Sequence, residues 1–299
     1  MNTNTFPLIT AALCLLASPP GAASGNAAPA SELKLIPGKY AAVAEQLIRE
    51  STQSRFAYDR LAELCDTFGP RFSGSTNLEA AIDWTLAEMK KDGFQNVRGE
   101  EVMIPHWVRG AESVEMLEPR PRKLPMLGLG GSVGTPPEGI VAPVLAVKTF
   151  AELRERAAEA RGKIVLFNTP FTEYRETVKI RYQGADEASR AGAVASLIRS
   201  VGPFSMQTPH TGGMRYSTSS RKIPHAAITI EDAQMLQRMQ DRGVTPKLKI
   251  KMEAKTLPDA RSRNVVAEIP GTEHPGQVVI VSGHIDSWDV GSGAMDDGG

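Results

Sequence analysis

The chain has 299 residues, with 34 lysines and arginines against 34 aspartates and glutamates, so its formal charge at pH 7 is zero. This balance argues against a nucleic-acid-binding surface, because such surfaces need clustered positive charge. A composition of 41% hydrophobic and 23% charged residues is typical of globular proteins rather than disordered ones, and the length is sufficient for two domains.

The N-terminal segment has a composition of its own. Residues Phe6 to Ala17 form an apolar run, which is followed by Ser18-Pro19-Pro20-Gly21 and further small residues. A short apolar core before small residues is typical of a secretory signal peptide, although neither lysine nor arginine precedes this one. The run is too short to span a bilayer. We therefore expect a signal peptide over residues 1–30, a secreted or periplasmic protein, and no membrane span.

Three helices are predicted by their start and stop signals. Thr76-x-x-Glu79 has the pattern of a capping box, and apolar residues recur at helical spacing from Leu78 until Asp92-Gly93 ends the helix. Thr149-x-x-Glu152 predicts a second helix, which ends at Gly162. Thr229 opens a third helix, which ends at Gly243.

Strands are predicted between these helices. The apolar runs 163–167 and 193–198, with a helical stretch at 185–191 between them, indicate a βαβ unit. Two further strands are predicted at 264–269 and 277–281, separated by turn-forming residues.

Composition also indicates how the chain is divided. Residues 119–138 are rich in proline and glycine, and a second boundary is predicted near Leu257-Pro258-Asp259. We therefore expect an α/β domain that is interrupted by an inserted domain over residues 125–256. The interrupted domain would comprise residues 31–124 and 257–299.

The densest group of chemically useful side chains follows the last predicted strand. That strand leads into Gly283-His284-Ile285-Asp286, and in open α/β sheets ligands bind at the carboxyl ends of strands. Imidazole is a common zinc ligand, and its second nitrogen needs an oriented acceptor, for which Asp286 is a candidate. Asp296 follows among small residues that allow a tight turn, where its carboxylate can bridge two metal ions. We expect His284 and Asp296 to lie close enough to share a metal cluster.

This segment resembles the metal-binding segment of the dinuclear zinc aminopeptidases and carboxypeptidases. The pattern is Gly-His-x-Asp-Ser-Trp-Asp-Val-Gly-x-Gly-Ala-Met-Asp-Asp-Gly-Gly over residues 283–299. Less specific similarities to the same family extend the resemblance over most of residues 38–299. They lie at Gly69-Pro70-Arg71-x-x-Gly74-Ser75, at 264–271, and, in the predicted insert, at 162–166, 191–195 and 223–228. The insert itself resembles a protease-associated domain.

The resemblance implies a fold and a site. The fold is α/β, with a zinc-exopeptidase doubly wound sheet that is incomplete in this chain and an inserted protease-associated-type domain. Two Zn²⁺ ions are implied in the complete site: His284 binds one, Asp296 bridges both, and Asp286 is the catalytic carboxylate behind His284. In the family, the glutamate general base and the remaining ligands follow the Asp-Asp-Gly-Gly segment. The resemblance therefore implies an N-terminal fragment, truncated within 257–299 and inactive by itself.

The implied activity is zinc-dependent hydrolysis of dipeptides or short peptides by an enzyme that is a homodimer when full length. Two alternatives are a non-catalytic, receptor-like member of the same fold and a metallohydrolase of a non-peptide amide. The intact His284 and Asp296 favour the enzyme over the receptor-like protein. Asp289 is expected to hold the Trp288 loop rather than a metal, and His210 to be a solvated loop residue. The remaining histidines show no ligand spacing; they are His106, His225 and His274.

Overall fold

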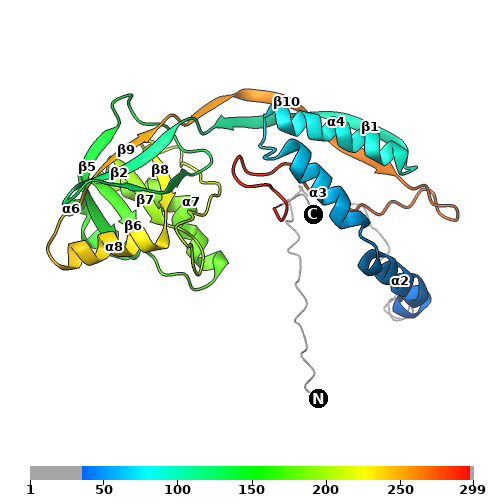
Figure 1. The fold of residues 1–299 in the computed structure, drawn as a ribbon, viewed down its shortest axis with the longest axis horizontal. Helices are drawn as coiled ribbons and strands as arrows, with labels where there is room; N and C mark the ends of the chain where they lie inside the picture. The colour runs from blue at the N-terminus through cyan, green and yellow to red at the C-terminus, as the bar shows by residue number, and fades with distance from the viewer. Residues whose placement is uncertain (1–35, 297–299) are drawn as a thin grey trace, which may run out of the picture. The chain divides into compact units, whose positions relative to one another are not determined.

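The computed structural model describes residues 36–296, and the chain divides after Arg55 into two compact units. In the first unit, the described residues form helix α2 (Ile36–Gln53). The second unit begins at Phe56 and holds the other helices and strands of the described range (Figure 1). The predicted signal peptide at residues 1–30 lies outside the described residues. Within residues 36–296, the helices are too short or too polar to cross a membrane.

Two helices open the second unit, α3 (Phe56–Phe68) and α4 (Thr76–Lys91). The helix predicted from residue 76 is confirmed, but its N-cap is Ser75 rather than Thr76. The Ser75 hydroxyl accepts a hydrogen bond from the Leu78 amide at 3.2 Å, which satisfies one of the amides that a helix start leaves unpaired. Gly93 adopts a φ of 85° just after the helix, as its predicted stop signal requires.

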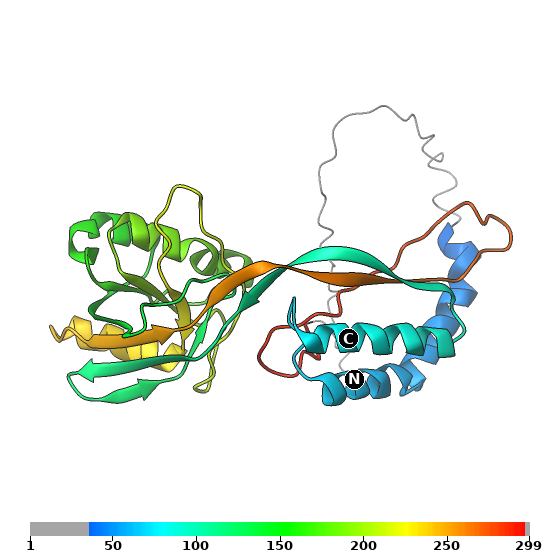
Figure 2. The ribbon, with the colours of Figure 1, turned by 90° about the horizontal axis from the view of Figure 1, so that it is seen from above.

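A long antiparallel ribbon follows, formed by β1 (Gln95–Val108) and β10 (Lys255–Glu268). Figure 2 shows the two strands running side by side, although they are far apart in the sequence. Arg263 of β10 forms ion pairs with Asp83 at 2.8 Å and with Glu79 at 3.3 Å, so α4 is attached to the ribbon. The strand predicted at 264–269 is the last part of β10.

The other strands form one mixed sheet in the order β3-β2-β9-β5-β6-β7-β8-β4. Strands β5 to β8 are parallel to one another, and the remaining pairs are antiparallel. The two outermost strands, β3 and β4, are separated in the chain by Pro125 alone, so the two ends of the sheet meet there. The strands are β2 (Glu112–Glu118), β3 (Arg122–Leu124), β4 (Met126–Gly128), β5 (Ile140–Val147), β6 (Ile164–Phe167), β7 (Ala195–Arg199), β8 (His225–Ile228) and β9 (Lys247–Met252).

Helices cover both faces of this sheet. Successive residues of a strand face opposite sides, and in β6 Ile164 and Leu166 join one buried cluster while Val165 and Phe167 join another. Helix α8 packs into the first cluster and α7 into the second. The predicted βαβ unit is therefore confirmed as β6-α7-β7, and the chain has the expected α/β class. The helices are α5 (Phe150–Glu155), α6 (Ala157–Ala160), α7 (Tyr174–Arg190) and α8 (Ile230–Asp241).

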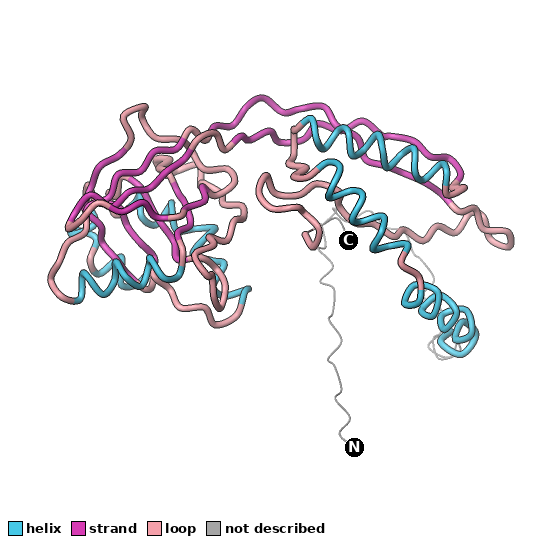
Figure 3. The backbone as a smooth tube through the Cα atoms, in the orientation of Figure 1, coloured by secondary structure: helices cyan, strands magenta, loops and turns pink. Residues whose placement is uncertain are grey.

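The strand predicted at 277–281 is wrong. These residues form a loop (Figure 3), and the side chains of Val278 to Val281 are at least 79% exposed. A strand exists only through hydrogen bonds to a neighbouring strand, and none of the described strands pairs with this segment. Residues 277–281 therefore have the composition of a buried strand, but no strand among the described residues pairs with them.

The proline- and glycine-rich stretch at 119–138 contains β3 and β4. The sheet is built from residues 112–252, and the ribbon strands β1 and β10 lie on either side of that range in the sequence. The division of the chain at residues 125 and 257 stays a prediction.

Candidate metal site

The three predicted site residues lie in one loop, which we call the 284–296 loop. His284 Nδ1 lies 2.8 Å from the main-chain oxygen of Asp286 and 3.1 Å from its Oδ1. His284 Nε2 lies 3.4 Å from Asp296 Oδ1. The imidazole of His284 thus stands between the two carboxylates, and the expected proximity of His284 and Asp296 is present. Their roles as metal ligands stay predictions.

The chemistry of these atoms fits a zinc site. Nδ1 of His284 faces two oxygens of Asp286, and Nε2 faces a carboxylate oxygen of Asp296. An imidazole whose Nδ1 donates a hydrogen bond to Asp286 presents the lone pair of Nε2 toward Asp296. Zinc takes imidazole nitrogen and carboxylate oxygen as ligands. Within residues 36–296, groups of three or more potential ligands do not come together. The described residues therefore supply part of a ligand set.

Arg71 is the residue that holds this loop most extensively. Its side chain is fully buried, and its main-chain N–H donates to Ser287 Oγ at 2.9 Å, while the Ser287 N–H donates to the Arg71 carbonyl at 3.0 Å. The guanidinium donates to the carbonyls of Ile285 at 2.9 Å and of Gly293 at 2.7 Å. Arg71 lies in a stretch that resembles the zinc-peptidase family, but the sequence did not predict a role for it. Its hydrogen-bond partners lie more than 200 residues further along the chain.

Trp288 and Asp289 connect the loop to neighbouring parts of the same unit. The Trp288 ring stacks on Phe72, with centroids 5.3 Å apart and planes at 29°. The Asp289 carboxylate accepts hydrogen bonds from Nη2 and Nε of Arg109 at 2.6 and 2.7 Å, and Arg109 also donates to the carbonyl of Gly128 in β4. This pairing fits the expectation that Asp289 holds the Trp288 loop. Arg109 could not be predicted as a loop contact, because no local sequence pattern indicates its pairing with Asp289.

His210 lies in a loop of the predicted insert. It is exposed, as expected for a loop histidine. The ring is nevertheless partly shielded from water, and this desolvation and the Arg181 guanidinium lower the pKa of His210, whereas the Asp296 carboxylate raises it. Arg181 is itself buried and donates to the carbonyls of Thr211 and Gly213, each at 3.2 Å. The Asp296 carboxylate is therefore near enough to His210 to affect its pKa.

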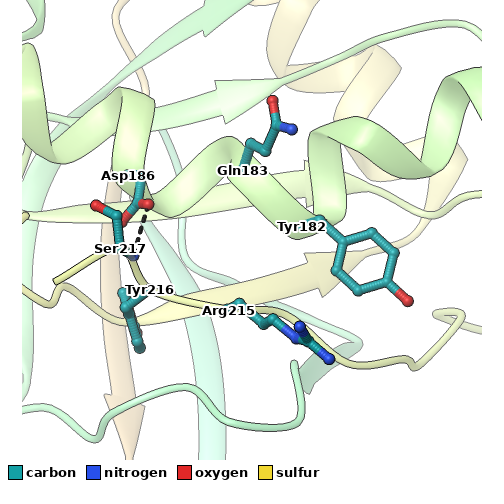
Figure 4. A pocket seen from close by; sticks show the side chains of 6 residues that line it. All are labelled: Tyr182, Gln183, Asp186, Arg215, Tyr216 and Ser217. Atoms are coloured by element: carbon teal, nitrogen blue, oxygen red, sulfur yellow. Dashed lines mark hydrogen bonds between the residues drawn. The ribbon is translucent and has the colours of Figure 1, made fainter. Parts of the chain in front are cut away.

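Two cavities differ in their relation to these residues. A cavity of about 710 Å³ is lined by α3, α4 and the ribbon, and it reaches His284 and Asp286. A second cavity, of about 500 Å³, lies between α7 and residues 215–217 (Figure 4). There Asp186 accepts a hydrogen bond from the Ser217 N–H at 2.8 Å, and its other oxygen is enclosed without a partner among the described residues. This second cavity contains none of the predicted site residues.

Comparison with known sequences finds similarity to peptidases. Residues 264–299 match peptidase family M28. The chain is 58% identical to carboxypeptidase Q of Homo sapiens over 243 residues, which cover 81% of this chain and 52% of the relative. It is 53% identical to carboxypeptidase Q of Mus musculus over 271 residues, which cover 90% of this chain and 58% of the relative. The chain thus spans a little more than half the length of these relatives.

Solved structures show the same fold. A peptidase M28 precursor from Shewanella amazonensis aligns with a TM-score of 0.82 and 34% identity, over 86% of this chain and 60% of that chain. A zinc aminopeptidase from Bacillus subtilis aligns with a TM-score of 0.59 and 24% identity, over 81% of this chain and 53% of that chain. The similarity to the Bacillus subtilis aminopeptidase shows a shared fold and no more. Together these neighbours confirm the predicted fold class.

Proposed function

We propose that the complete protein is a zinc-dependent exopeptidase of peptidase family M28 that hydrolyses dipeptides or short peptides, because residues 264–299 match that family and most of the chain is similar to carboxypeptidase Q. The observation that carries the proposal is the convergence of His284 Nε2 and Asp296 Oδ1 at 3.4 Å. Asp286 stands 3.1 Å behind the other ring nitrogen, as an orienting carboxylate should.

Each of the three residues has a separate role in this proposal. His284 would hold one zinc ion through Nε2, and Asp296 would be a ligand of both ions. Asp286 accepts a hydrogen bond from Nδ1, which fixes the ring and keeps the Nε2 lone pair directed at the metal. Zinc bound there supplies a Lewis acid that polarises the scissile carbonyl and lowers the pKa of water. Asp286 thereby acts on the reaction through the orientation of His284.

The substrate and setting of the complete protein follow from the same premise. High identity to proteins named carboxypeptidase supports a substrate with a free C-terminus. The apolar run before residue 30 supports export to the periplasm or the medium. A homodimer is part of the proposal and rests on the resemblance alone.

Zinc content tests the roles of the two carboxylates. Asp296→Ala should leave the complete protein with less than the two ions of the wild type, because two cations without a bridging anion repel each other. Asp286→Ala should keep more zinc and lose affinity or activity by roughly 10–100-fold. Asp259→Ala, at an exposed aspartate of β10, is the control and should match the wild type. Retention of both ions by Asp296→Ala and loss of both by Asp286→Ala would reverse the assignment.

Activity on unblocked dipeptides, measured with and without a chelator, tests the function itself. We expect hydrolysis that the chelator abolishes and added zinc restores, and slower cleavage when the substrate C-terminus is amidated. Zinc binding without peptide hydrolysis would instead support the receptor-like protein or the hydrolase of a non-peptide amide. Hydrolysis that is insensitive to the chelator would refute the mechanism.

A further inference from the structure

Arg71 is a fully buried cation that is held by carbonyl groups rather than by a carboxylate. None of the ion pairs formed by the described residues includes it, and its exposed fraction is 0%. Its guanidinium donates to the carbonyls of Gly69 at 2.7 Å, Ile285 at 2.9 Å, Ser292 at 3.2 Å and Gly293 at 2.7 Å. Burying an unpaired charge costs several kcal/mol, and an apolar side chain would fill the same space without that cost. The charge is therefore best explained by what its donors hold.

The carbonyls that Arg71 holds lie at both ends of the segment between the two predicted ligands. Ile285 directly follows His284, and Gly293 lies shortly before Asp296. Between them, Ser287 exchanges hydrogen bonds with the main chain of Arg71 in both directions. One residue thus binds the beginning, the middle and the end of the connection from His284 to Asp296.

The shape of the guanidinium suits this task. Its donors form a rigid planar fork, so bonds made in different directions fix the carbonyls relative to one another. Close packing reinforces the constraint at Gly293, where an added Cβ would lie 2.5 Å from Ser287 Oγ and 2.9 Å from Arg71 Nη2. A lysine would keep the charge but would present all its donors from a single nitrogen.

We propose that Arg71 is a positioning residue, which sets the separation of His284 and Asp296 by binding the backbone of the 284–296 loop at both ends. The inference rests on the proposed function, because it takes these two residues as zinc ligands. Arg71 acts on the metal through the loop, because its hydrogen bonds reach main-chain carbonyls and the Ser287 hydroxyl rather than the side chains of His284 and Asp296.

The test compares Arg71→Lys with wild type in the complete protein, by amide hydrogen exchange of residues 285–293 and by zinc affinity. We expect exchange in this segment to accelerate at least about tenfold, since local opening no longer breaks the fork. Zinc affinity should fall by roughly 10–100-fold, as for other residues that orient ligands. Arg122→Lys is the matched control, because Arg122 pairs with the buried Asp232 of α8 instead; it should leave both readouts unchanged.

Gly293→Ala tests the same contact from the loop, in case the Arg71 variant does not fold. The added Cβ would clash with the Ser287 side chain and with Arg71 Nη2, so it would disturb the bonds that these two side chains form between Arg71 and the loop while the charge stays. The φ of 65° at Gly293 is also unfavourable for alanine, so the same two changes are expected. Loop exchange and zinc affinity at wild-type levels in Arg71→Lys would overturn the proposal. If wild type itself binds no zinc, the proposed function fails, whereas the exchange measurement still decides whether Arg71 orders the loop.

Discussion

His225 illustrates how the environment of a single residue can change its chemistry. It begins strand β8, and none of its surface is exposed. Its Nε2 lies 3.2 Å from the Arg181 carbonyl, and the ring is so close to α7 that a Cβ added at Gly184 would lie 3.1 Å away. Because burial disfavours the charged imidazolium, the pKa of His225 falls to about 4.

Acid should therefore destabilise the protein through His225. The unfolded chain takes up this proton near pH 6.5 and the folded chain only near pH 4, so stability falls as the pH drops from about 6.5 to 4. The loss from this group is about 3 kcal/mol at pH 4. In denaturant unfolding at pH 7.5 and pH 4, His225→Gln should lose less stability by about that amount than wild type does. The exposed His274→Gln should behave as wild type; equal losses in both variants would contradict the assignment.

At the scale of an element, the 284–296 loop is held by the packing of the Trp288 ring between Phe72 and Gly130, which we call the Trp288 seat. The Trp288 ring stacks on Phe72 on one side. On another side it lies against Gly130, where an added Cβ would be 2.5 Å from the ring atoms. Gly130 has no left-handed backbone angle, so its small size, rather than its conformation, is what the seat requires.

Gly130→Ala should therefore displace Trp288. The rigid ring cannot give way as a flexible side chain could, so we expect a loss of about 1–3 kcal/mol in the free energy of unfolding and a changed near-ultraviolet circular dichroism spectrum. Gly276→Ala is the control, because nothing lies within 4 Å of its added Cβ. Its stability should stay within about 0.5 kcal/mol of wild type. A Gly130→Ala protein as stable as this control would show that the seat is loose.

At the scale of the whole second unit, the ribbon brings distant parts of the chain to the loop. Val108 at the end of β1 pairs with Lys255 at the start of β10, so the residues between them leave and return at one place. Arg71 precedes the ribbon, and Arg109 lies directly after β1. Both bind the 284–296 loop, which follows β10. The loop is thus fixed by segments from both sides of the sheet-forming residues in the sequence.

Zinc should stabilise the complete protein as a whole, because a ligand that binds only the folded state adds to the free energy of unfolding. At a free zinc concentration of 100 times Kd, the expected gain is about 2.7 kcal/mol. Thermal unfolding in zinc buffers, repeated with a chelator, measures it. Asp296→Ala should gain much less, and Asp259→Ala should gain as much as wild type. An equal gain in Asp296→Ala would place the stabilising ion elsewhere.

The sequence by itself determined features whose causes are local. Thr149 and Thr229 cap their helices with their side chains as predicted, the cap predicted at Thr76 is one residue earlier at Ser75, and glycines at 93, 162 and 243 follow the helical segments. Capping and left-handed turns depend on neighbouring residues. The βαβ unit and the grouping of His284, Asp286 and Asp296 were also predictable. The latter lie within one short loop, whose spacing limits how far apart they can be.

Only the tertiary structure decided which distant residues hold that loop and which apolar runs become strands. Arg71 and Arg109 bond to residues at least 180 positions away, and no local pattern encodes such a pairing. Strand formation at 277–281 was predicted from composition and failed, because pairing needs a neighbour as well as a suitable sequence. Pro125 joins the two outermost strands of the sheet, a position between strands that tolerates a residue without a main-chain N–H.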